Sequence, residues 1–167
     1  MHSVSLNKVK HNRNAFDCEV KVLNNYLKQM ANQQSNRDNT RTYILENEAC
    51  EEQIVGFYTL TMMSIDLSAL PMALQKKHKN VSSAGLIARL GVDTKYKQKG
   101  YGEWLLVDAL KKLLNASDVV AFPFIVVDAK EGASAFYEKF GFQRFKDEGN
   151  RLFISIETVR KSFGDNA

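Results

Sequence analysis

The sequence predicts an α+β fold, in which a central mixed β-sheet of six to seven strands is flanked by helices on both faces. Two β-rich segments joined by a short connection in the first half favour an antiparallel pair. In the second half, apolar strand-like runs alternate with helix-like runs, as they do where helices connect parallel strands. The chain has 167 residues, 44% of them hydrophobic and 25% charged. It is long enough to bury its own core, so we expect a single domain over residues 1–167.

The first half is expected to contain one helix and one strand pair. From about Phe16 to Arg37, apolar residues recur at spacings of three and four, which predicts an amphipathic helix with Asp17 available near its N-terminus. Residues 40–45 and 54–64 are rich in β-branched and aromatic residues, and we expect them to form strands joined by a turn over 46–53. The following segment, 65–82, carries Pro71 and a basic cluster, which indicates a long, partly helical connection over the surface.

The second half is expected to alternate between strands and helices. Residues 85–92 are apolar except for Arg89 and read as a largely buried strand, followed by a polar loop over 93–99. The expected order then continues with a strongly apolar helix over 100–114, a buried strand over 119–128, a helix over 131–140, and strands over 143–146 and 151–157.

Basic residues are concentrated in one part of the chain. The whole sequence has 23 Lys and Arg against 19 Asp and Glu, a net charge of +4, whereas residues 70–112 alone hold nine Lys or Arg and three Asp or Glu, a net +6. Local positive charge of this kind points to an anionic partner.

The two cysteines, Cys18 and Cys50, show no C-x-x-C spacing and no Cys/His ligand pattern, so we expect neither a disulfide scaffold nor a metal site. No apolar run has the length of a signal peptide or of a membrane span. These features predict a cytoplasmic chain with no membrane association.

The segment from Arg89 to Leu106 carries the clearest chemical signal. A buried strand runs into a loop with lysines and two glycines, and this loop opens a helix. Unpaired amides at a helix N-terminus attract phosphate, and the glycines allow a ligand to approach the main chain. The pattern matches neither a nucleoside triphosphatase loop nor a dinucleotide fingerprint, so it implies the pyrophosphate of another cofactor. By itself it is equally consistent with a solvated loop. The residues expected to bind the pyrophosphate, chiefly through backbone N–H groups, are Lys97, Gln98, Lys99, Gly100, Tyr101 and Gly102.

Two motifs together resemble the GNAT family of acyl-CoA-dependent N-acetyltransferases. The loop 97–102 fits the pattern Gln/Arg-x-x-Gly-x-Gly/Ala, with Lys97 in place of Gln or Arg, and residues 133–142 fit A-x-x-F-Y-x-x-x-G-F in full. The resemblance implies acetyl-CoA as cofactor, and splayed central strands that form its cleft. It also implies that Leu90 and Val92 offer backbone groups to the pantetheine arm and the thioester, and that Ser134 reaches the cofactor. Lys130 stands where many members have Asn.

Six dispersed phrases are similar to a narrower group, the TacT-like toxins of bacterial type II toxin–antitoxin pairs. Such toxins acetylate the free α-amine of the amino acid on a charged tRNA and so block translation, and a ribbon-helix-helix antitoxin holds them inactive. The resemblance therefore implies aminoacyl-tRNA as substrate, such an antitoxin as partner, and a homodimer. The phrases span residues 16–27, 41–43, 55–60, 87–93, 102–110 and 127–129.

The resemblance implies that Tyr137 is the general acid that protonates the departing thiolate, as the family places a tyrosine near the sulfur. The alternative is that Tyr137 fills the core with Phe136 and Phe140. No carboxylate stands out as a general base. An α-amino group, with a reference pKa near 7.7–8.0, is substantially neutral at physiological pH, so a dedicated base is unnecessary. We expect Asp66, Asp93 and Asp128 to be turn or cap residues.

Basic side chains fit a polyanionic substrate, because contacts with phosphates provide affinity that does not depend on base sequence. Arg41 or Arg89 could instead pair with a carboxylate. Two alternative functions stay open: a GNAT enzyme acting on a small-molecule amine or a protein N-terminus, and a non-catalytic acyl-CoA-binding or RNA-binding module. The residues expected to contact tRNA are Arg37, Arg41, Lys76, Lys77, Lys79, Arg89 and Lys95.

Overall fold

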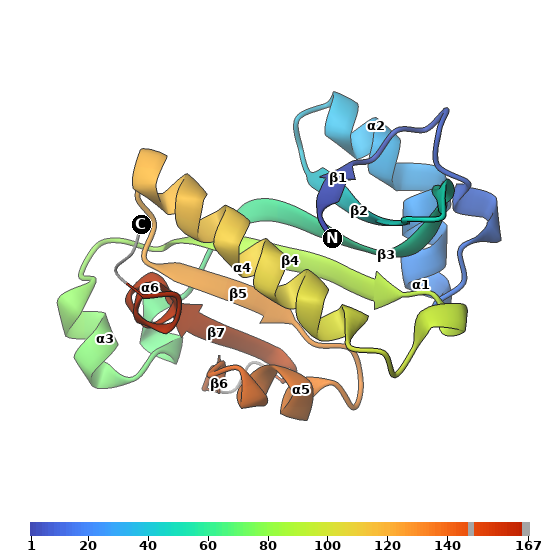
Figure 1. The fold of residues 1–167 in the computed structure, drawn as a ribbon. Coiled ribbons are helices and arrows are strands. Elements are labelled where there is room, and N and C mark those ends of the chain that lie inside the picture. The colour runs from blue at the N-terminus through green and yellow to red at the C-terminus, as the bar shows by residue number, and fades with distance from the viewer. Residues whose placement is uncertain (147–148, 165–167) are drawn as a thin grey trace. The chain divides into compact units, whose positions relative to one another are not determined.

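The computed structural model describes residues 1–146 and 149–164 and contains a seven-stranded sheet with the order β1-β2-β3-β4-β5-β7-β6 (Figure 1). β4 and β5 pair in parallel, whereas the pairs β1–β2, β2–β3, β5–β7 and β6–β7 are antiparallel. The predicted mixed sheet of six to seven strands is therefore confirmed. The strands are β1 (Ser3–Ser5), β2 (Arg41–Asn47), β3 (Cys50–Ser64), β4 (Ser83–Val92), β5 (Phe124–Asp128), β6 (Gln143–Arg144) and β7 (Arg151–Ser155).

Helical segments connect these strands. The α-helices are α1 (Lys21–Asn25), α2 (Ala31–Asn36), α3 (Met72–Lys77), α4 (Tyr101–Val119), α5 (Ser134–Lys139) and α6 (Ile156–Ser162). Between α1 and α2 lies a π-helical turn, η2 (Tyr26–Met30), and the 3₁₀ turns are η1 (Arg13–Ala15), η3 (Leu67–Ala69) and η4 (Thr94–Tyr96). The chain forms two compact units, one of residues 1–61 and 88–109 and the other of residues 62–87 and 110–167.

In the first unit, helices cover both faces of the strands β1 to β3. On one face, Leu27 and Ala31 pack with Ile44 and Phe57 in a buried apolar cluster. On the other face, the first half of α4 approaches β3 so closely that a side chain on Gly56 would lie 2.7 Å from Leu105 Cδ1. Glycine is thus required at this crossing because nothing larger fits between the strand and the helix.

In the second unit, helices also cover both faces of the sheet. η3 and α3 cover one face, where Leu70 is fully buried beside Phe124 and Phe153. On the opposite face, a Cβ on Gly85 would lie 2.9 Å from Leu113 of α4. β4 and β5 pair in parallel register over 84–87 and 124–127. The prediction of helices on both faces is confirmed in each unit.

The N-terminal helix differs most from its prediction. Residues 16–20 are not helical, since Cys18 N–H donates to Asn24 Oδ1 (2.9 Å) and the chain folds back on itself before α1 begins at Lys21. Asp17 accepts hydrogen bonds from Glu19 N–H and Asn24 Nδ2 instead of capping the helix. Side-chain amides and carboxylates that bind the nearby backbone compete with helix formation, which explains the later start.

Other boundaries also move. α4 continues to Val119, so β5 begins only at Phe124. The β2–β3 strands extend into the predicted turn, leaving only residues 48–49 between them. One strand and one α-helix were not predicted: the three-residue β1, and α6, whose start is capped by Ser155 Oγ accepting from Thr158 N–H (3.1 Å). The partly helical connection over 65–82 is confirmed.

Among the described residues, no helix is long and apolar enough to cross a membrane. No group of three or more His, Cys, Asp or Glu side chains that could hold a metal ion occurs in residues 1–146 and 149–164. Cys18 is buried and Cys50 exposed, and both are free thiols.

Candidate active site

The loop that follows β4 is fixed at its start by Asp93. This side chain is only 4% exposed, its Oδ1 accepts from Lys95 N–H (2.9 Å), and its Oδ2 accepts from Asp17 N–H (3.0 Å). Thr94 N–H donates in turn to the Asp17 carbonyl (2.9 Å). Asp93 is thus a cap, as predicted, and it also joins the loop to the segment before α1.

Lys97 is held by the same segment. Its Nζ donates to the Cys18 carbonyl (3.2 Å) and lies 3.1 Å from Glu19 Oε2. The ammonium group is part-exposed, so an anionic ligand can compete with Glu19 for it. Glu19 has φ +68, a left-handed conformation that is uncommon for a residue with a side chain. The left-handed conformation of Glu19 and its ion pair with Lys97 thus occur at the point where residues 17–19 contact the loop after β4.

The backbone at the start of α4 provides donors for an anion. At the start of α4, Trp104 N–H donates to the Gly100 carbonyl (3.1 Å), and the amides of Tyr101 and Gly102 precede this first helical hydrogen bond. Gly100 has φ +84, and a Cβ built on it would meet nothing within 4 Å. The loop is therefore open beside Gly100, and the donors present fit a pyrophosphate group.

β4 presents alternate residues to opposite faces as it enters this loop. Gly91 is buried, and its Cβ position lies 3.3 Å from Cys18 Sγ and 3.5 Å from Phe57. Leu90 and Val92 point to the other face and are half-buried. Their side chains therefore do not pack with Cys18 and Phe57 on the face of Gly91. The role of their backbone groups in binding the cofactor stays a prediction.

Tyr137 lies on α5 in the second unit and is 7% exposed. Its ring packs edge-on against Phe136 (centroids 5.1 Å apart) and Phe142 (5.7 Å), whereas Phe140 packs against Phe136 (5.4 Å). Burial raises the pKa of the Tyr137 hydroxyl to about 12. Within residues 1–146 and 149–164 the Tyr137 hydroxyl has no hydrogen-bond partner. Every fully buried side-chain polar atom in these residues has one, so the Tyr137 hydroxyl is not fully buried and a ligand can reach it. Ser134, also buried, is the first residue of α5.

Four of the basic residues expected to contact tRNA lie in the first unit. Arg37 and Lys95 are exposed. Arg41 donates to the Ser35 carbonyl (2.9 Å) and pairs with Asp38 (2.6 Å), the carboxylate alternative noted above. The guanidinium carbon of Arg89 lies 3.5 Å from the centre of the Tyr26 ring, which makes a cation–π contact.

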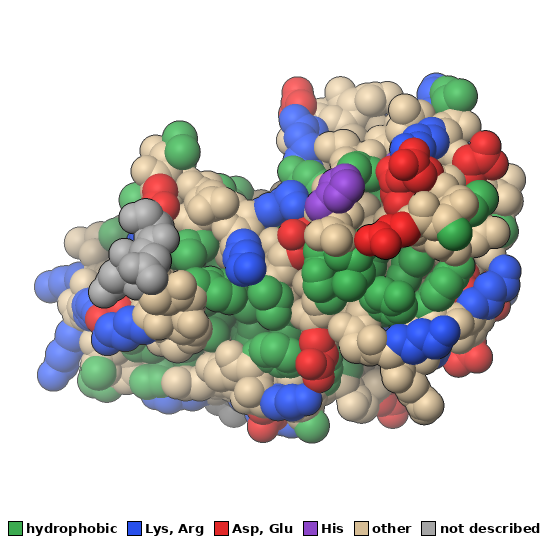
Figure 2. All heavy atoms as spheres, viewed as in Figure 1, with side chains coloured by type: hydrophobic (Ala, Val, Ile, Leu, Met, Phe, Trp, Pro, Cys, Tyr) green, Lys and Arg blue, Asp and Glu red, His purple; other side chains and the backbone are tan. Residues whose placement is uncertain are grey.

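The other three lie in the second unit, at the end of α3. Lys76 and Lys79 are exposed, and Lys77 pairs with Glu157 of α6. Figure 2 shows Lys and Arg side chains gathered on the side of the molecule where Figure 1 places α3 and α6. The lysine cluster noticed in the sequence is thus a solvent-facing group rather than part of the core.

The sequence gives no direct sign that Asp17 and Glu19 contact the loop after β4. The spacing of apolar residues predicts that both belong to a helix, whereas the structure has them in the non-helical segment before α1. The sequence sign of this contact is only that segments 16–27 and 87–93 both resemble the TacT-like toxins. Asp66 caps η3 by accepting from Ser68 N–H (3.0 Å), as expected. The prediction for Asp128 is wrong, because it is the last residue of β5 and pairs with Arg151 of β7 (2.8 Å) instead of capping a turn or helix.

Comparison with known proteins agrees with this reading. The acetyltransferase (GNAT) domain model matches residues 11–162. A probable toxin TacT of Sinorhizobium fredii is 30% identical over 165 residues, which cover 93% of this chain and 91% of the relative. A tRNA-acetylating toxin of Mycobacterium tuberculosis is 28% identical and matches 90% of each chain.

Two solved structures are similar over nearly their whole length. AtaT complexed with acetyl-methionyl-tRNAfMet has 26% identity and a TM-score of 0.87, with 97% of this chain and 98% of that chain covered. A tyrosine-to-phenylalanine mutant of AtaT, bound to the C-terminus of the antitoxin AtaR and acetyl-CoA, has 26% identity and a TM-score of 0.81, with 96% of each chain covered. From its sequence motifs, its fold and the match over residues 11–162, the chain belongs to the GNAT acetyltransferase family.

Proposed function

We propose that this protein is a toxin that transfers an acetyl group from acetyl-CoA to the α-amino group of an aminoacyl-tRNA and thereby blocks translation. The observation that carries the proposal is the end-to-end match to a tRNA-acetylating toxin, which covers 90% of each chain. The likeness to AtaT in complex with an acetylated methionyl-tRNA supports the same substrate class.

The chain holds acetyl-CoA chiefly through the loop 97–102. Acetyl-CoA supplies the acetyl group as a thioester. The first-turn amides at Tyr101 and Gly102 and the side chains of Lys97 and Lys99 bind the pyrophosphate, with Gln98 and Gly100 shaping the turn. Backbone groups of Leu90 and Val92 and the hydroxyl of Ser134 complete the set that contacts the cofactor. The acetyl-CoA complex of an AtaT mutant supports this assignment.

Tyr137 is the proton donor. Its hydroxyl, whose pKa burial raises to about 12, is protonated at physiological pH, and it gives this proton to the sulfur of CoA as the thioester C–S bond breaks. The hydroxyl has no partner in the described part of the chain that would compete for this proton. The α-amino group attacks in its neutral form, whose reference pKa near 7.7–8.0 removes the need for a dedicated base.

The exposed basic side chains bind the tRNA backbone. Lys76 and Lys79 of the second unit are solvent-facing, as are Arg37 and Lys95 of the first. Lys77, Arg41 and Arg89 already have partners in the fold, so they contribute less freely. Since phosphate contacts release counterions, the affinity for tRNA falls with salt.

The remaining proposals rest on the resemblance to the toxin group. We propose one GNAT domain over residues 1–167, a cytoplasmic location where charged tRNA is found, a ribbon-helix-helix antitoxin as the neutralising partner, and a homodimer. The complex of an AtaT mutant with the C-terminus of AtaR supports a protein partner of this kind.

An acetyl-transfer assay tests the proposal. Purified protein is incubated with labelled acetyl-CoA and bulk charged tRNA, with deacylated tRNA, a panel of small amines and N-terminal peptides as parallel acceptors. We expect label only in charged tRNA, released as acetylated amino acid by mild base. Preferential labelling of the amines or peptides would contradict the proposal, and so would binding of acetyl-CoA without transfer to any acceptor.

A further inference from the structure

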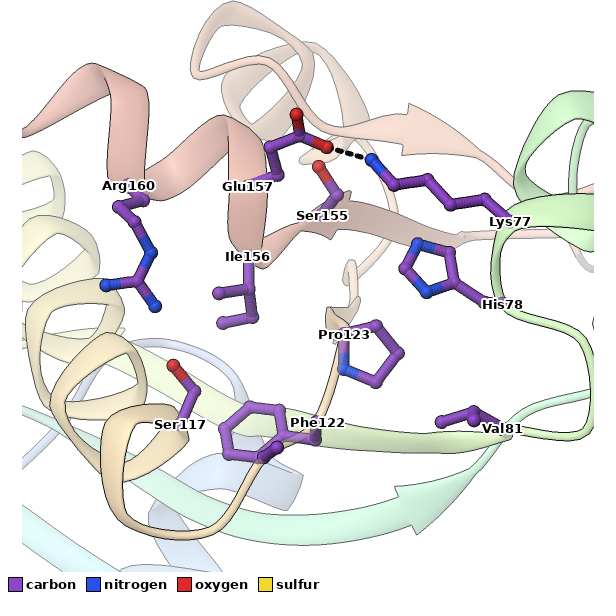
Figure 3. A pocket seen from close by; sticks show the side chains of 11 residues that line it. Lys77, His78, Val81, Ser117, Phe122, Pro123, Ser155, Ile156, Glu157 and Arg160 are labelled. Atoms are coloured by element: carbon purple, nitrogen blue, oxygen red, sulfur yellow. Dashed lines mark hydrogen bonds and ion pairs between the residues drawn. The ribbon is translucent and has the colours of Figure 1, made fainter.

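A pocket of about 440 Å³ lies in the second unit, at the N-terminal ends of the parallel strands β4 and β5. Tyr137 lies on the helix that follows the opposite end of β5, a five-residue strand of roughly 15 Å. The pocket is therefore separate from the proposed proton donor. Its lining residues are Lys77, His78, Val81, Ser117, Ala121, Phe122, Pro123, Ser155, Ile156, Glu157 and Arg160 (Figure 3).

The floor of the pocket is apolar. Phe122, Pro123 and Ile156 lie between the end of α4 and the start of α6, and Val81 adds to the floor from the segment before β4 (Figure 3). Phe122 and Ile156 are otherwise well packed, at 5% and 7% exposed. A concave, mostly apolar surface with a few polar groups is typical of small-molecule sites, and a volume of 440 Å³ is within their usual range.

The polar groups stand on opposite walls. In Figure 3, the Arg160 guanidinium and the His78 ring point into the pocket from its two sides. Arg160 uses one nitrogen to pair with Asp118 (2.9 Å), which leaves its other N–H groups for a ligand. His78 contacts Phe124 edge-on, with ring centroids 4.9 Å apart, and its ring nitrogens have no hydrogen-bond partner among the described residues.

The charges around the rim select the sign of the ligand. Cations outnumber carboxylates there, and Lys77 already neutralises Glu157. Burial, and next the charge of Lys77, lower the pKa of His78, so its imidazole is neutral near pH 7 and can both donate and accept. The charged residues on α3 and just after it, on α6 and at the end of α4 are Lys76, Lys77, Lys79, Arg160 and Lys161 against Asp118 and Glu157.

We propose that this pocket binds a small carboxylate with an aryl or branched alkyl body, its carboxylate on Arg160 and a polar group at its far end on His78. The apolar floor excludes a highly charged ligand such as a polyphosphate, because its charges would lose hydration there without enough partners. A single carboxylate matches the fork of an Arg side chain. This inference goes beyond the proposed acetyl transfer and does not depend on it.

The test uses 3-(4-hydroxyphenyl)propionate as probe and its amide as the uncharged analogue, with binding measured by calorimetry. We expect saturable binding to the unaltered protein, about tenfold weaker for the amide. Arg160→Gln should weaken binding of the acid about tenfold, so that the acid and the amide bind with equal affinity. Ala121→Trp, which fills the pocket from an exposed position, abolishes binding of both.

Two matched variants serve as controls. Arg144→Gln breaks a comparable surface pair with Glu138, and Ala116→Trp adds the same bulk to the exposed face of α4. Both should bind the probe normally, and all four variants should keep the acetyl-CoA affinity of the unaltered protein. The proposal is overturned by no saturable binding, by binding that survives Ala121→Trp, or by a loss of self-association on Ala121→Trp without probe binding, which would mean that a second copy occupies the pocket.

Discussion

Tyr137 combines two properties that a single-sequence reading treats as alternatives. Its ring contacts Phe136 and Phe142 as part of the core, and its hydroxyl nevertheless has no partner among the described residues. Packing fixes the ring, and burial raises the pKa of the hydroxyl to about 12, which keeps it protonated but makes it a weaker acid. The fixed position of the hydroxyl, and not its acid strength, is what suits it to donate a proton. The core contacts are therefore compatible with the proposed role of Tyr137 as proton donor.

Tyr137→Phe should lower kcat for acetyl transfer by about 100-fold or more, because it removes the proton donor and keeps the ring. The measurement is single-turnover transfer to charged tRNA. Acetyl-CoA affinity and Tm serve as controls and should stay unchanged, since the ring contacts remain. Unchanged turnover would show that Tyr137 only fills the core.

Gln98 shows how one residue can carry local strain in a binding loop. Its φ is +62, in the left-handed region that side chains other than glycine adopt at a cost of about 1 kcal/mol. Nothing in the residue type of Gln98 marks this conformation, because the sequence places the glycines of the loop at 100 and 102.

Gln98→Gly should therefore stabilise the protein by about 0.5–1 kcal/mol in urea unfolding and leave acetyl-CoA affinity nearly unchanged, because the proposed contacts use the backbone. Lys99→Gly is the matched control. Lys99 is not among the positive-φ residues, so glycine there should bring no gain. Destabilisation by Gln98→Gly would mean that the Gln98 side chain makes contacts that outweigh the strain.

Among elements, the loop after β4 depends on a segment distant in sequence. Asp93 is bound to Asp17 and Lys97 to Cys18 and Glu19, so residues 17–19 and 93–97 form one hydrogen-bonded structure within the first unit. The helix at α4 and the strand at β4 follow from periodicity and composition. The contacts between the two loops do not, because a hydrogen bond between residues about 75 positions apart leaves no periodic trace in the sequence.

Helix α3 offers an element whose charge can be changed without disturbing the core. The double variant Lys76→Glu/Lys79→Glu should weaken tRNA binding and reduce the slope of log K against log salt concentration by about 2, since each lysine is expected to neutralise about one phosphate. Filter binding over a range of salt concentrations measures both effects.

Two further measurements separate a tRNA contact from a general effect of charge or folding. Lys8→Glu/Lys21→Glu makes the same charge change at exposed positions of the first unit and should affect tRNA binding much less. Acetyl-CoA affinity should be normal in both double variants. Equal weakening of tRNA binding by the two pairs would assign the effect to net charge alone.

At the scale of the whole molecule, two buried tyrosines link stability to alkaline pH. Burial raises the pKa of Tyr137 to about 12, and burial together with the hydrogen bond to Asp108 strongly raises that of Tyr58. In the unfolded chain both ionise near pH 10, so above pH 10 the unfolded state binds fewer protons than the folded state. Stability is therefore unaffected below about pH 10 and falls as pH rises above it.

The free energy of unfolding should fall by up to about 1.4 kcal/mol for each of these tyrosines between pH 10 and 11, as measured by urea unfolding. In Tyr137→Phe, the free energy of unfolding should fall less between pH 10 and 11, by the contribution of this one tyrosine. Between pH 7 and 9 it should not depend on the ionisation of residue 137 in either protein. A parallel pH dependence in the variant and the unaltered protein would show that Tyr137 ionises in the folded state at its ordinary pKa.

The sequence alone determined the α+β class, the mixed sheet with helices on both faces, and the family, because these depend on periodicity and on local motifs such as residues 97–102 and 133–142. Only the tertiary structure decided that residues 16–20 lie outside the helix and that residues 17–19 contact the loop after β4. The same holds for the stacking of Arg89 on Tyr26 and for the pocket where β4 and β5 begin. The excess of positive charge over residues 70–112 was likewise visible from the start, but not that Lys77 is paired and Lys76 and Lys79 are exposed. Each of these depends on side chains brought together from distant segments, where packing and long-range hydrogen bonds override local preference.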